Sequence, residues 1–209
     1  MTTNKKLAEL LNSCSWETYG EDTQVHFEFN NGELIVAFCG SNSKVDWKNN
    51  FTFWKKPYKR MKVTYFVHKG FLKAWKACRD EIMDKIKSFN PSSIIITGHS
   101  YGGAIATFCK EDCWFQLPEL RDKTRLVTFG SPRIIGFFNY KKIKERWENS
   151  TLLNNGSDIV CAVPPWYFGY RHVTKQTRLG ETTHWWNYFF PTKYHMLDDY
   201  IKSIDKVTL

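Results

Sequence analysis

A serine flanked by glycines is the feature of this 209-residue chain that points most directly to chemistry. Gly98, Ser100 and Gly102 form a Gly-x-Ser-x-Gly motif between the β-branched run Ile94–Ile96 and an apolar stretch that starts at Ala104. A sharp strand-to-helix turn leaves little room on either side of the serine, so glycine fits both positions. Such a turn exposes the hydroxyl and directs the positive end of a helix at it. We predict that Ser100 is a nucleophile.

A serine hydroxyl is a weak nucleophile unless a base activates it and an acid orients that base. On a turn of this type the acid and then the histidine follow the serine along the chain. Asp158 follows strand-like residues and an Asn-Gly-Ser turn, which places it at the carboxyl edge of a strand. The other acidic residues between Ser100 and the last histidine lie mostly in helical or charged stretches, where we expect solvated carboxylates: Glu111, Asp112, Glu119, Asp122, Glu145, Glu148 and Glu181.

Three histidines follow the serine and are candidates for the base. His195 stands directly before a helical C-terminal stretch, a loop position from which its imidazole can reach the serine turn. His172 lies in an alternating, strand-like run, which is more typical of a structural histidine, and His184 lies in an aromatic run where either role is open. His99 precedes the serine and is expected to point to the other side of the turn as a packing residue.

Alternating strand-like and helical segments must position these side chains. Strands are predicted at residues 23–29, 33–38, 63–67, 94–96, 125–129 and 151–154, with extended segments between 168 and 178. Helices are predicted at residues 7–14, 70–89, 104–115, 140–147 and 195–204. Asn-Gly between the first two strands predicts a hairpin. The alternation predicts an α/β fold with a mainly parallel central sheet flanked by helices, and the absence of a repeat or linker predicts one domain over 1–209.

Composition limits the class of protein. Hydrophobic residues make up 42% and aromatic residues 17% of the chain, which excludes a disordered protein, and no apolar run approaches the ~20 residues that span a bilayer. The six cysteines have no metal-binding spacing, so we expect reduced core thiols and no metal. The formal charge of +9 favours an anionic partner, although a basic surface without a partner is equally compatible with it.

The first residues determine the expectation about location. Lys5 and Lys6 precede only a short amphipathic stretch, with no apolar core of a signal peptide and no small-residue cleavage site. We therefore expect a protein that is cytoplasmic or released without a signal peptide.

Several ordered motifs resemble the class 3 lipases, the fungal-type triacylglycerol lipases of the α/β-hydrolase superfamily. The resemblance extends from about Phe38 to Tyr200. It is carried by these residues: Phe38-Cys39-Gly40-Ser41, Asp46-Trp47, Val67-His68-Lys69-Gly70-Phe71, Gly98-His99-Ser100-Tyr101-Gly102-Gly103-Ala104, Thr128-Phe129-Gly130-Ser131-Pro132-Arg133, Asn154 to Asp158, Val160, Pro164-Pro165, Gly169-Tyr170-Arg171-His172-Val173, His195 and Tyr200.

The resemblance implies an α/β-hydrolase fold and roles for individual residues. Ser100 would be the nucleophile, His195 the general base and then acid, and Asp158 the residue that orients it. The oxyanion hole would use the backbone N–H groups of Ser41 and Tyr101. The family usually has arginine at the position of Cys39, a departure that leaves the backbone donor of the loop in place. No metal or organic cofactor is implied.

The segment after the second strand, about residues 42–62, corresponds to the family's lid. It interleaves lysines and arginine with aromatic residues, among which Trp47, Phe51, Phe53 and Trp54 are candidates for contacts with lid and substrate. Its basic residues would suit an anionic membrane or lipid surface, whereas a plain covering loop with buried aromatics is the alternative. Two further aromatic runs, 166–168 and 185–190, are compatible with an acyl-chain lining or with core packing.

The leading functional hypothesis is a serine carboxylester hydrolase that acts on acylglycerols or related lipid esters through an acyl-enzyme. A phospholipase and an acyltransferase with the same triad are close alternatives. A non-catalytic lipid-binding or nucleic-acid-binding protein on the same scaffold belongs to a different class, because a fold alone does not define a function. The basic residues are spread along the chain without a recognised nucleic-acid module, so no nucleic acid is expected. The sequence leaves the oligomeric state open.

Overall fold

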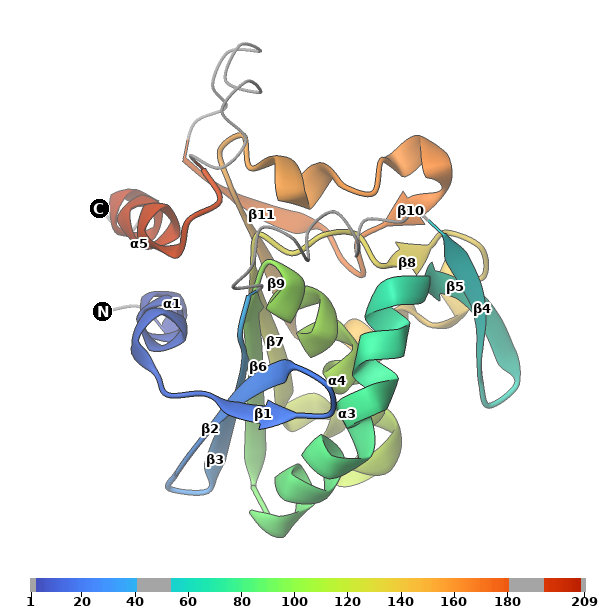
Figure 1. Cartoon of the computed structure of the whole chain (residues 1–209), viewed down its shortest axis with the longest axis horizontal. Helices are drawn as coiled ribbons and strands as arrows, with labels where there is room; N and C mark the ends of the chain where they lie inside the picture. The colour runs from blue at the N-terminus through green and yellow to red at the C-terminus, as the bar shows by residue number, and fades with distance from the viewer. Residues whose placement is uncertain (1–2, 41–53, 181–193, 208–209) are drawn as a thin grey trace.

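The computed structural model describes residues 3–40, 54–180 and 194–207. Its largest element is a seven-stranded sheet in the order β1-β2-β3-β6-β7-β9-β11 (Figure 1). The strands are β1 (Glu17–Tyr19), β2 (Thr23–Asn30), β3 (Glu33–Phe38), β6 (Ser93–His99), β7 (Thr124–Phe129), β9 (Ser150–Asn155) and β11 (Gln176–Leu179). The neighbours from β3 to β11 pair in parallel, and only β1 and β2 run antiparallel to their neighbours. The predicted α/β-hydrolase architecture is confirmed.

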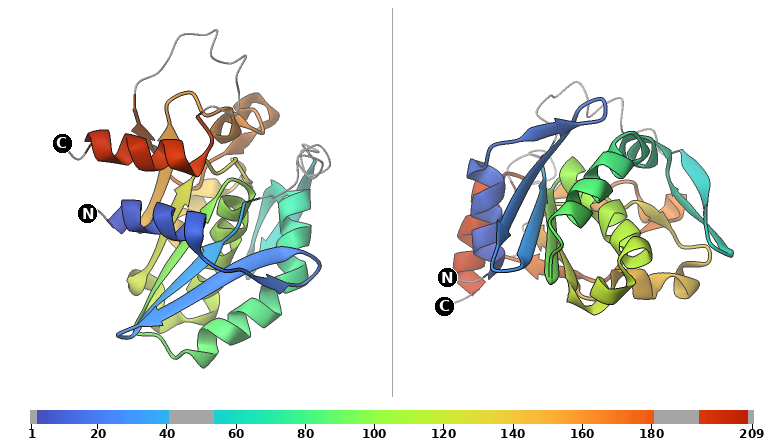
Figure 2. Two further views of the ribbon diagram at one scale, coloured as in Figure 1. Left: turned by 60° about the vertical axis from the view of Figure 1, so that its left-hand side comes forward. Right: turned by 90° about the horizontal axis from the view of Figure 1, so that it is seen from below.

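Helices cover both faces of this sheet (Figures 1 and 2). Helices α3 (Lys69–Ser88) and α4 (Tyr101–Gln116) pack on one face, and α1 (Thr3–Ser13) and α5 (Leu197–Val207) lie side by side on the other. Strand β6 shows why its β-branched run is continuous: Ile94 and Ile96 join the core under α3 and α4, while Ile95 joins the core under α1 and α5. A strand buried on both faces requires apolar residues at successive positions.

A second, four-stranded antiparallel sheet stands beyond α3 in the order β10-β8-β5-β4 (Figure 1). Its strands are β4 (Lys55–Arg60), β5 (Val63–His68), β8 (Ile135–Gly136) and β10 (Tyr170–Arg171). Strand β4 corrects the lid prediction, because residues 55–60 of the predicted range 42–62 form a regular strand paired with β5. Residues 42–53 of that range lie outside the described residues.

The predicted elements are otherwise close to those observed. The Asn-Gly turn joins β2 and β3 as a hairpin, and the long helix predicted at 70–89 is α3. The helix predicted at 140–147 is wrong. Two short 3-10 turns, η2 (Tyr140–Lys142) and η3 (Lys144–Trp147), occupy this segment, because Asn139 is left-handed and Ile143 departs from helical geometry. The remaining 3-10 turns are η1 (Pro118–Lys123), η4 (Ile159–Ala162) and η5 (Trp166–Phe168).

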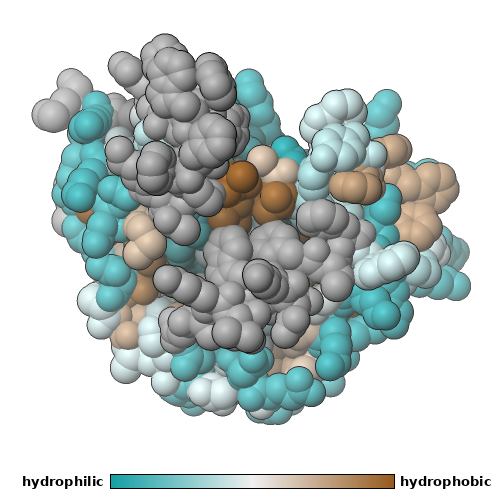
Figure 3. All heavy atoms as spheres, turned by 45° about the horizontal axis from the view of Figure 1, so that its top comes forward, coloured by the Kyte–Doolittle hydropathy of each residue, from teal (hydrophilic) through white to brown (hydrophobic). Residues whose placement is uncertain are grey.

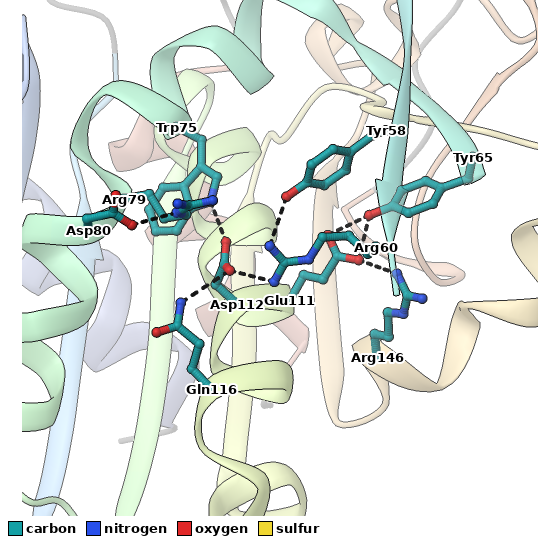
Figure 4. A network of polar contacts seen from close by, with 10 residues as sticks. All are labelled: Tyr58, Arg60, Tyr65, Trp75, Arg79, Asp80, Glu111, Asp112, Gln116 and Arg146. Carbon is teal, nitrogen blue, oxygen red and sulfur yellow. Dashed lines mark hydrogen bonds and ion pairs between the residues drawn. The ribbon is translucent and has the colours of Figure 1, made fainter. Parts of the chain in front are cut away.

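Buried charges fasten the small sheet to α4 (Figure 4). Arg60 of β4 donates to the Asp112 carboxylate at 2.6 Å, and Trp75 of α3 donates its indole N–H to the other carboxylate oxygen at 2.7 Å. Glu111 accepts hydrogen bonds from Tyr65 of β5 and from Arg146. The expectation that Glu111 and Asp112 are solvated is therefore wrong, since both are buried and fully engaged. A helical position alone does not reveal which face a carboxylate occupies.

Candidate active site

Ser100 occupies a strained turn between β6 and α4. Its backbone has φ 55° and ψ −122°, a combination that non-glycine residues rarely adopt and that is typical of functional turns. The flanking glycines are required by close packing: a Cβ at Gly98 would lie 2.5 Å from the carbonyl of Gly102, and one at Gly102 would collide with the carbonyl of Phe38. The amide of Ser100 donates to the carbonyl of Phe129 at 2.9 Å. The turn therefore has the geometry of a nucleophile elbow.

Asp158 lies at the carboxyl end of β9, three residues beyond the strand, and caps η4. Its Oδ1 accepts the amide N–H of Val160 at 2.9 Å. Its Oδ2 is approached by three side chains: His195 Nδ1 at 2.8 Å, the hydroxyl of Tyr200 at 2.7 Å and the thiol of Cys161 at 3.9 Å. Because a carboxylate only accepts, Nδ1 of His195 carries the proton, and Nε2 is left as the basic atom of the ring. Both Asp158 and His195 are buried.

Gly130 brings this pair to the serine turn. It follows β7 with φ 62°, and a Cβ there would lie 2.7 Å from Asp158 Oδ2 and 2.9 Å from the His195 ring. Its neighbour Phe129 accepts the Ser100 amide. The structure thus brings Asp158 and His195 into hydrogen-bond contact and places the turn of Ser100 at the same corner of the sheet.

His99 contradicts the prediction that it points away from the site. Its ring lies 4.5 Å from the ring of His195, centroid to centroid, and its Nε2 is 2.6 Å from the backbone carbonyl of His195. Burial and, to a smaller extent, the neighbouring His195 lower the pKa of His99 to about 3. The neutral ring must donate from Nε2, because a carbonyl only accepts. His99 therefore holds the loop that carries His195.

Tyr200 contacts the candidate triad, although the sequence alone suggests no role for it. It lies on the first turn of α5, five residues after His195, and is fully buried. Its hydroxyl donates to Asp158 and accepts the amide N–H of Asn155 at 3.1 Å. Burial, with Cys161 and Asp158 nearby, raises the pKa of Tyr200 well above its usual value, so the hydroxyl keeps its proton. The sequence offers one signal for this contact, a tyrosine five residues after the candidate histidine.

The expected oxyanion hole is described in part. Tyr101 is the first residue of α4, and its ring lies 5.7 Å from the ring of Phe71. Gly40 lies against the serine turn, because a Cβ added at Gly40 would be 3.7 Å from the Cβ of Ser100. Ser41 lies outside the described residues, as do three of the four candidate contacts, Trp47, Phe51 and Phe53. Trp54 is 72% exposed.

Other candidates have structural surroundings. His172 Nε2 lies 2.8 Å from the carbonyl of Cys161, and burial lowers the pKa of His172 to about 4. His184 lies outside the described residues. The six cysteines are free thiols, four of them buried, and Cys14 and Cys39 are half-buried. Within the described ranges, no cluster of three or more His, Cys, Asp or Glu residues could hold a metal ion, and no helix is long and apolar enough to cross a membrane.

The two predicted aromatic runs differ in outcome. Trp166, Tyr167 and Phe168 are 71%, 68% and 47% exposed, so the expectation that they pack in the core is wrong, whereas a role in lining an acyl chain stays a prediction. Residues 185–190 are not among the described ones.

Comparisons with known proteins define the class of protein. The family model described as Lipase (class 3) matches residues 35–168, and the chain belongs to this family. Secreted mono- and diacylglycerol lipase 1 of Fusarium solani is 31% identical over 152 residues, which are 69% of this chain and 43% of that protein. A lipase of Rhizomucor miehei is 30% identical over 171 residues, 78% of this chain and 46% of that protein.

Solved structures agree with the fold. The Rhizomucor miehei triacylglyceride lipase superposes with a TM-score of 0.70 at 25% identity, over 79% of this chain and 65% of that one. The mono- and diacylglycerol lipase of Aspergillus oryzae gives a TM-score of 0.65 at 25% identity, over 82% and 64%. This chain spans less than half the length of the two curated relatives above.

The comparisons also correct the expected location. Relatives from Fusarium solani, Penicillium cyclopium and Malassezia globosa are named secreted lipases, which contradicts the prediction of a cytoplasmic protein or one released without a signal peptide. That prediction depended on the N-terminal residues alone, and they do not decide the compartment.

Proposed function

We propose that this protein is a serine carboxylester hydrolase that acts on acylglycerols or related lipid esters, with Ser100, His195 and Asp158 as the catalytic triad. The observation that carries the proposal is the buried Asp158–His195 hydrogen bond of 2.8 Å beside the strained turn of Ser100. A carboxylate that fixes the histidine tautomer next to a strained strand-to-helix turn carrying a serine is the arrangement that serine acyl transfer requires.

The reaction proceeds in two symmetrical halves. Ser100 Oγ attacks the ester carbonyl carbon while His195 Nε2 takes the hydroxyl proton, and Asp158 stabilises the resulting imidazolium. The negative oxygen of the tetrahedral intermediate is held by backbone N–H groups, for which we assign Tyr101 and Ser41. The C–O bond to the alcohol then breaks as His195 returns the proton to the leaving oxygen. Water repeats the sequence on the acyl-enzyme and releases the fatty acid and free Ser100.

Lipid esters are the substrate class that the comparisons favour. The relatives carry the names mono- and diacylglycerol lipase and triacylglyceride lipase. In the space-filling view, apolar atoms are visible near the centre of the face that looks up in Figure 1, the face at which the parallel strands end (Figure 3). The lid contacts, the anionic surface expected for residues 42–62 and the single domain over 1–209 remain predictions.

Hydrolysis of a panel of p-nitrophenyl esters with short to long acyl chains tests the proposal. We expect turnover by the wild type and a loss of at least about 10⁴-fold in Ser100→Ala. Ser131→Ala is a matched control, because it removes a buried hydroxyl that lies beside Gly103 and donates to the carbonyl of Pro132. Equal activity in Ser100→Ala and wild type would refute the triad.

The acyl acceptor and the lipid class are separate questions for the same assay. A rate that rises when a long-chain ester exceeds its solubility identifies a lipase, and a decline with chain length identifies an esterase of soluble substrates. Release of fatty acid from phospholipid vesicles, or transfer of the acyl group to an added alcohol in place of water, would instead support the phospholipase or the acyltransferase. A chain that binds lipid without turning over any ester is the non-catalytic alternative.

A further inference from the structure

Charge is distributed very unevenly over this molecule. Residues 54–69, 131–142 and 159–175 hold eleven of the 30 lysines and arginines and none of the 21 aspartates and glutamates. The rest of the chain has 19 basic and 21 acidic residues, so it is close to neutral. The net charge of +9 therefore comes from these three segments.

The three segments form one structure. They contain all four strands of the small sheet, with the turns η2, η4 and η5. The amide of His68 donates to Ile134 at 2.9 Å, and Lys55 Nζ donates to the carbonyl of Phe168 at 2.7 Å. The rings of Phe66 and Phe138 are 6.2 Å apart. We define this assembly, residues 54–69, 131–142 and 159–175, as the basic lobe.

Most basic side chains of the lobe face solvent. Arg60 is paired with Asp112, and Arg133 donates to the carbonyls of Ala162 and Pro164. The other nine are exposed: Lys55, Lys56, Lys59, Lys62, Lys69, Lys141, Lys142, Arg171 and Lys175. Because the lobe has no carboxylate of its own, the electrostatic potentials of these cations add and make the surface of the lobe positive.

Exposed aromatic side chains stand among these cations. Phe137 and Phe138 follow β8 and are 64% and 59% exposed, and the ring of Phe137 lies against Gly169, which directly follows the exposed Trp166, Tyr167 and Phe168 of η5. The amide of Phe137 donates to Gly169, which joins the two groups. Apolar residues gather in this way at the right of the space-filling view, with hydrophilic residues around them (Figure 3). Five exposed aromatic residues in one cluster are more than scattered surface apolar residues would supply.

We propose that the basic lobe docks this protein on an anionic lipid surface. Tryptophan, tyrosine and phenylalanine enter the headgroup boundary, while lysines attract anionic headgroups within a Debye length. Asp158, the orienting carboxylate of the site, directly precedes η4, so the lobe adjoins the active site. The Arg60–Asp112 ion pair holds β4 to α4, and the Tyr65–Glu111 hydrogen bond holds β5 to the same helix (Figure 4), so docking positions the catalytic corner at the surface.

Binding to vesicles tests this docking without hydrolysis. Docking would serve the proposed lipid-ester activity, and in that sense this proposal rests on it, but binding itself requires no turnover. Binding is therefore measured with the Ser100→Ala variant of the whole 209-residue chain, which leaves the vesicle lipids unhydrolysed. We expect binding to phosphatidylcholine vesicles that contain phosphatidylglycerol to be at least about tenfold tighter than to phosphatidylcholine alone, and to weaken as salt is raised. Equal, salt-insensitive binding to both vesicles would overturn the proposal, whatever the outcome of the ester assay.

Matched charge reversals locate the surface. In the Ser100→Ala background, Lys59→Glu with Lys141→Glu should weaken binding to the anionic vesicles by at least about tenfold. The control Lys85→Glu with Lys87→Glu changes the charge equally on exposed positions of α3, outside the lobe, and should change binding by less than about twofold. Equal losses in the two double variants, with unfolding midpoints unchanged, would overturn the assignment to the lobe.

The aromatic part and the competing polyanion have their own tests. Phe137→Ser with Trp166→Ser should reduce the binding that persists at high salt, because the apolar contribution is not screened. Unchanged high-salt binding would contradict insertion of these rings. Tighter binding to a DNA duplex than to the anionic vesicles would overturn the choice of lipid as the partner.

Discussion

The Asp158 carboxylate is the most heavily constrained group of the site. Four donors reach it: the Val160 amide, the Tyr200 hydroxyl, Nδ1 of His195 and, at 3.9 Å, the Cys161 thiol. Hydrogen bonds to a charged acceptor are stronger than those between neutral groups and fix its orientation. Since Tyr200 and His195 share the same oxygen, Oδ2, the tyrosine also sets the position at which the imidazole is held.

Tyr200→Phe tests this positioning role. The variant loses a hydrogen bond to a carboxylate and leaves the buried amide of Asn155 without its acceptor, so we expect the free energy of unfolding to fall by about 1–3 kcal/mol. We also expect kcat to fall by roughly tenfold with little change in KM, because the histidine is less well held. Steady-state kinetics and chemical unfolding measure both.

Tyr140→Phe is the control that separates a loss of histidine positioning from a loss of fold stability. Its hydroxyl donates to the carbonyl of Val173, away from the triad, so its loss should lower stability and leave kcat unchanged. If the two variants lose kcat to the same extent, Tyr200 acts only through the stability of the fold.

The sequence was sufficient for the Asp158–His195 pair and insufficient for its neighbours. Chain order and the carboxyl edges of parallel strands identify the acid and the histidine, because few candidates satisfy both conditions. His99 was misplaced, since a residue beside a strained turn does not follow the alternation of a regular strand. His195 and Tyr200 are adjacent in space to His99 and Asp158 only through the packing of α5, which no local pattern contains.

At the scale of elements, the helices and strands with strong hydrophobic periodicity can be predicted from the sequence, whereas those that depend on tertiary contacts cannot. Helix α3 and the β2–β3 hairpin follow from apolar spacing and an Asn-Gly turn. Strand β4 has the sequence Lys-Lys-Pro-Tyr-Lys-Arg, with one buried side chain, Tyr58. Its strand geometry comes from pairing with β5 and from the Arg60–Asp112 ion pair, so its own residues do not indicate it.

Arg60→Met tests how much this ion pair contributes to the attachment of β4. It leaves the Asp112 carboxylate buried without its cation, and we expect a loss of about 3–5 kcal/mol in the free energy of unfolding. The double variant Arg60→Met with Asp112→Asn should recover much of that loss, because a neutral amide still accepts the indole N–H of Trp75. Denaturant titrations compare the two, and a double variant no more stable than the single one would contradict this account.

At the scale of the whole molecule, the net charge does not show where the charged residues lie. The formal charge of +9 indicates an anionic partner but gives no location, and more than sixty residues of sequence separate the first of the charged segments from the other two. The three-layer core followed from pattern because strands and helices alternate. The basic lobe did not, because its strands are short and come from three separate segments of the chain.

Acid sensitivity is a further property of the whole molecule. Burial lowers the pKa of His172 to about 4, whereas an unfolded histidine titrates near 6.5. Between these values the unfolded chain binds a proton that the folded chain excludes, so the free energy of unfolding decreases as the pH falls from about 6.5 to about 4. Above this window the contribution is fully present.

His172→Gln tests that linkage. The amide can still donate to the carbonyl of Cys161 but takes up no proton, so the variant should lose less stability than the wild type between pH 7 and pH 5. The difference in slope approaches about 1.4 kcal/mol per pH unit at most. Denaturant unfolding at several pH values measures it, and parallel pH dependences would show that His172 is not the group involved.

Covalent labelling with a fluorophosphonate tests the central claim most directly, because the reagent phosphonylates an activated serine and reports its position by mass. We expect one adduct, on the peptide that contains Ser100, none in Ser100→Ala, and labelling slowed by about 10³-fold or more in His195→Ala, where the base is missing. An adduct on another serine, or no adduct on the folded wild-type chain, would contradict the assignment of Ser100 as the nucleophile.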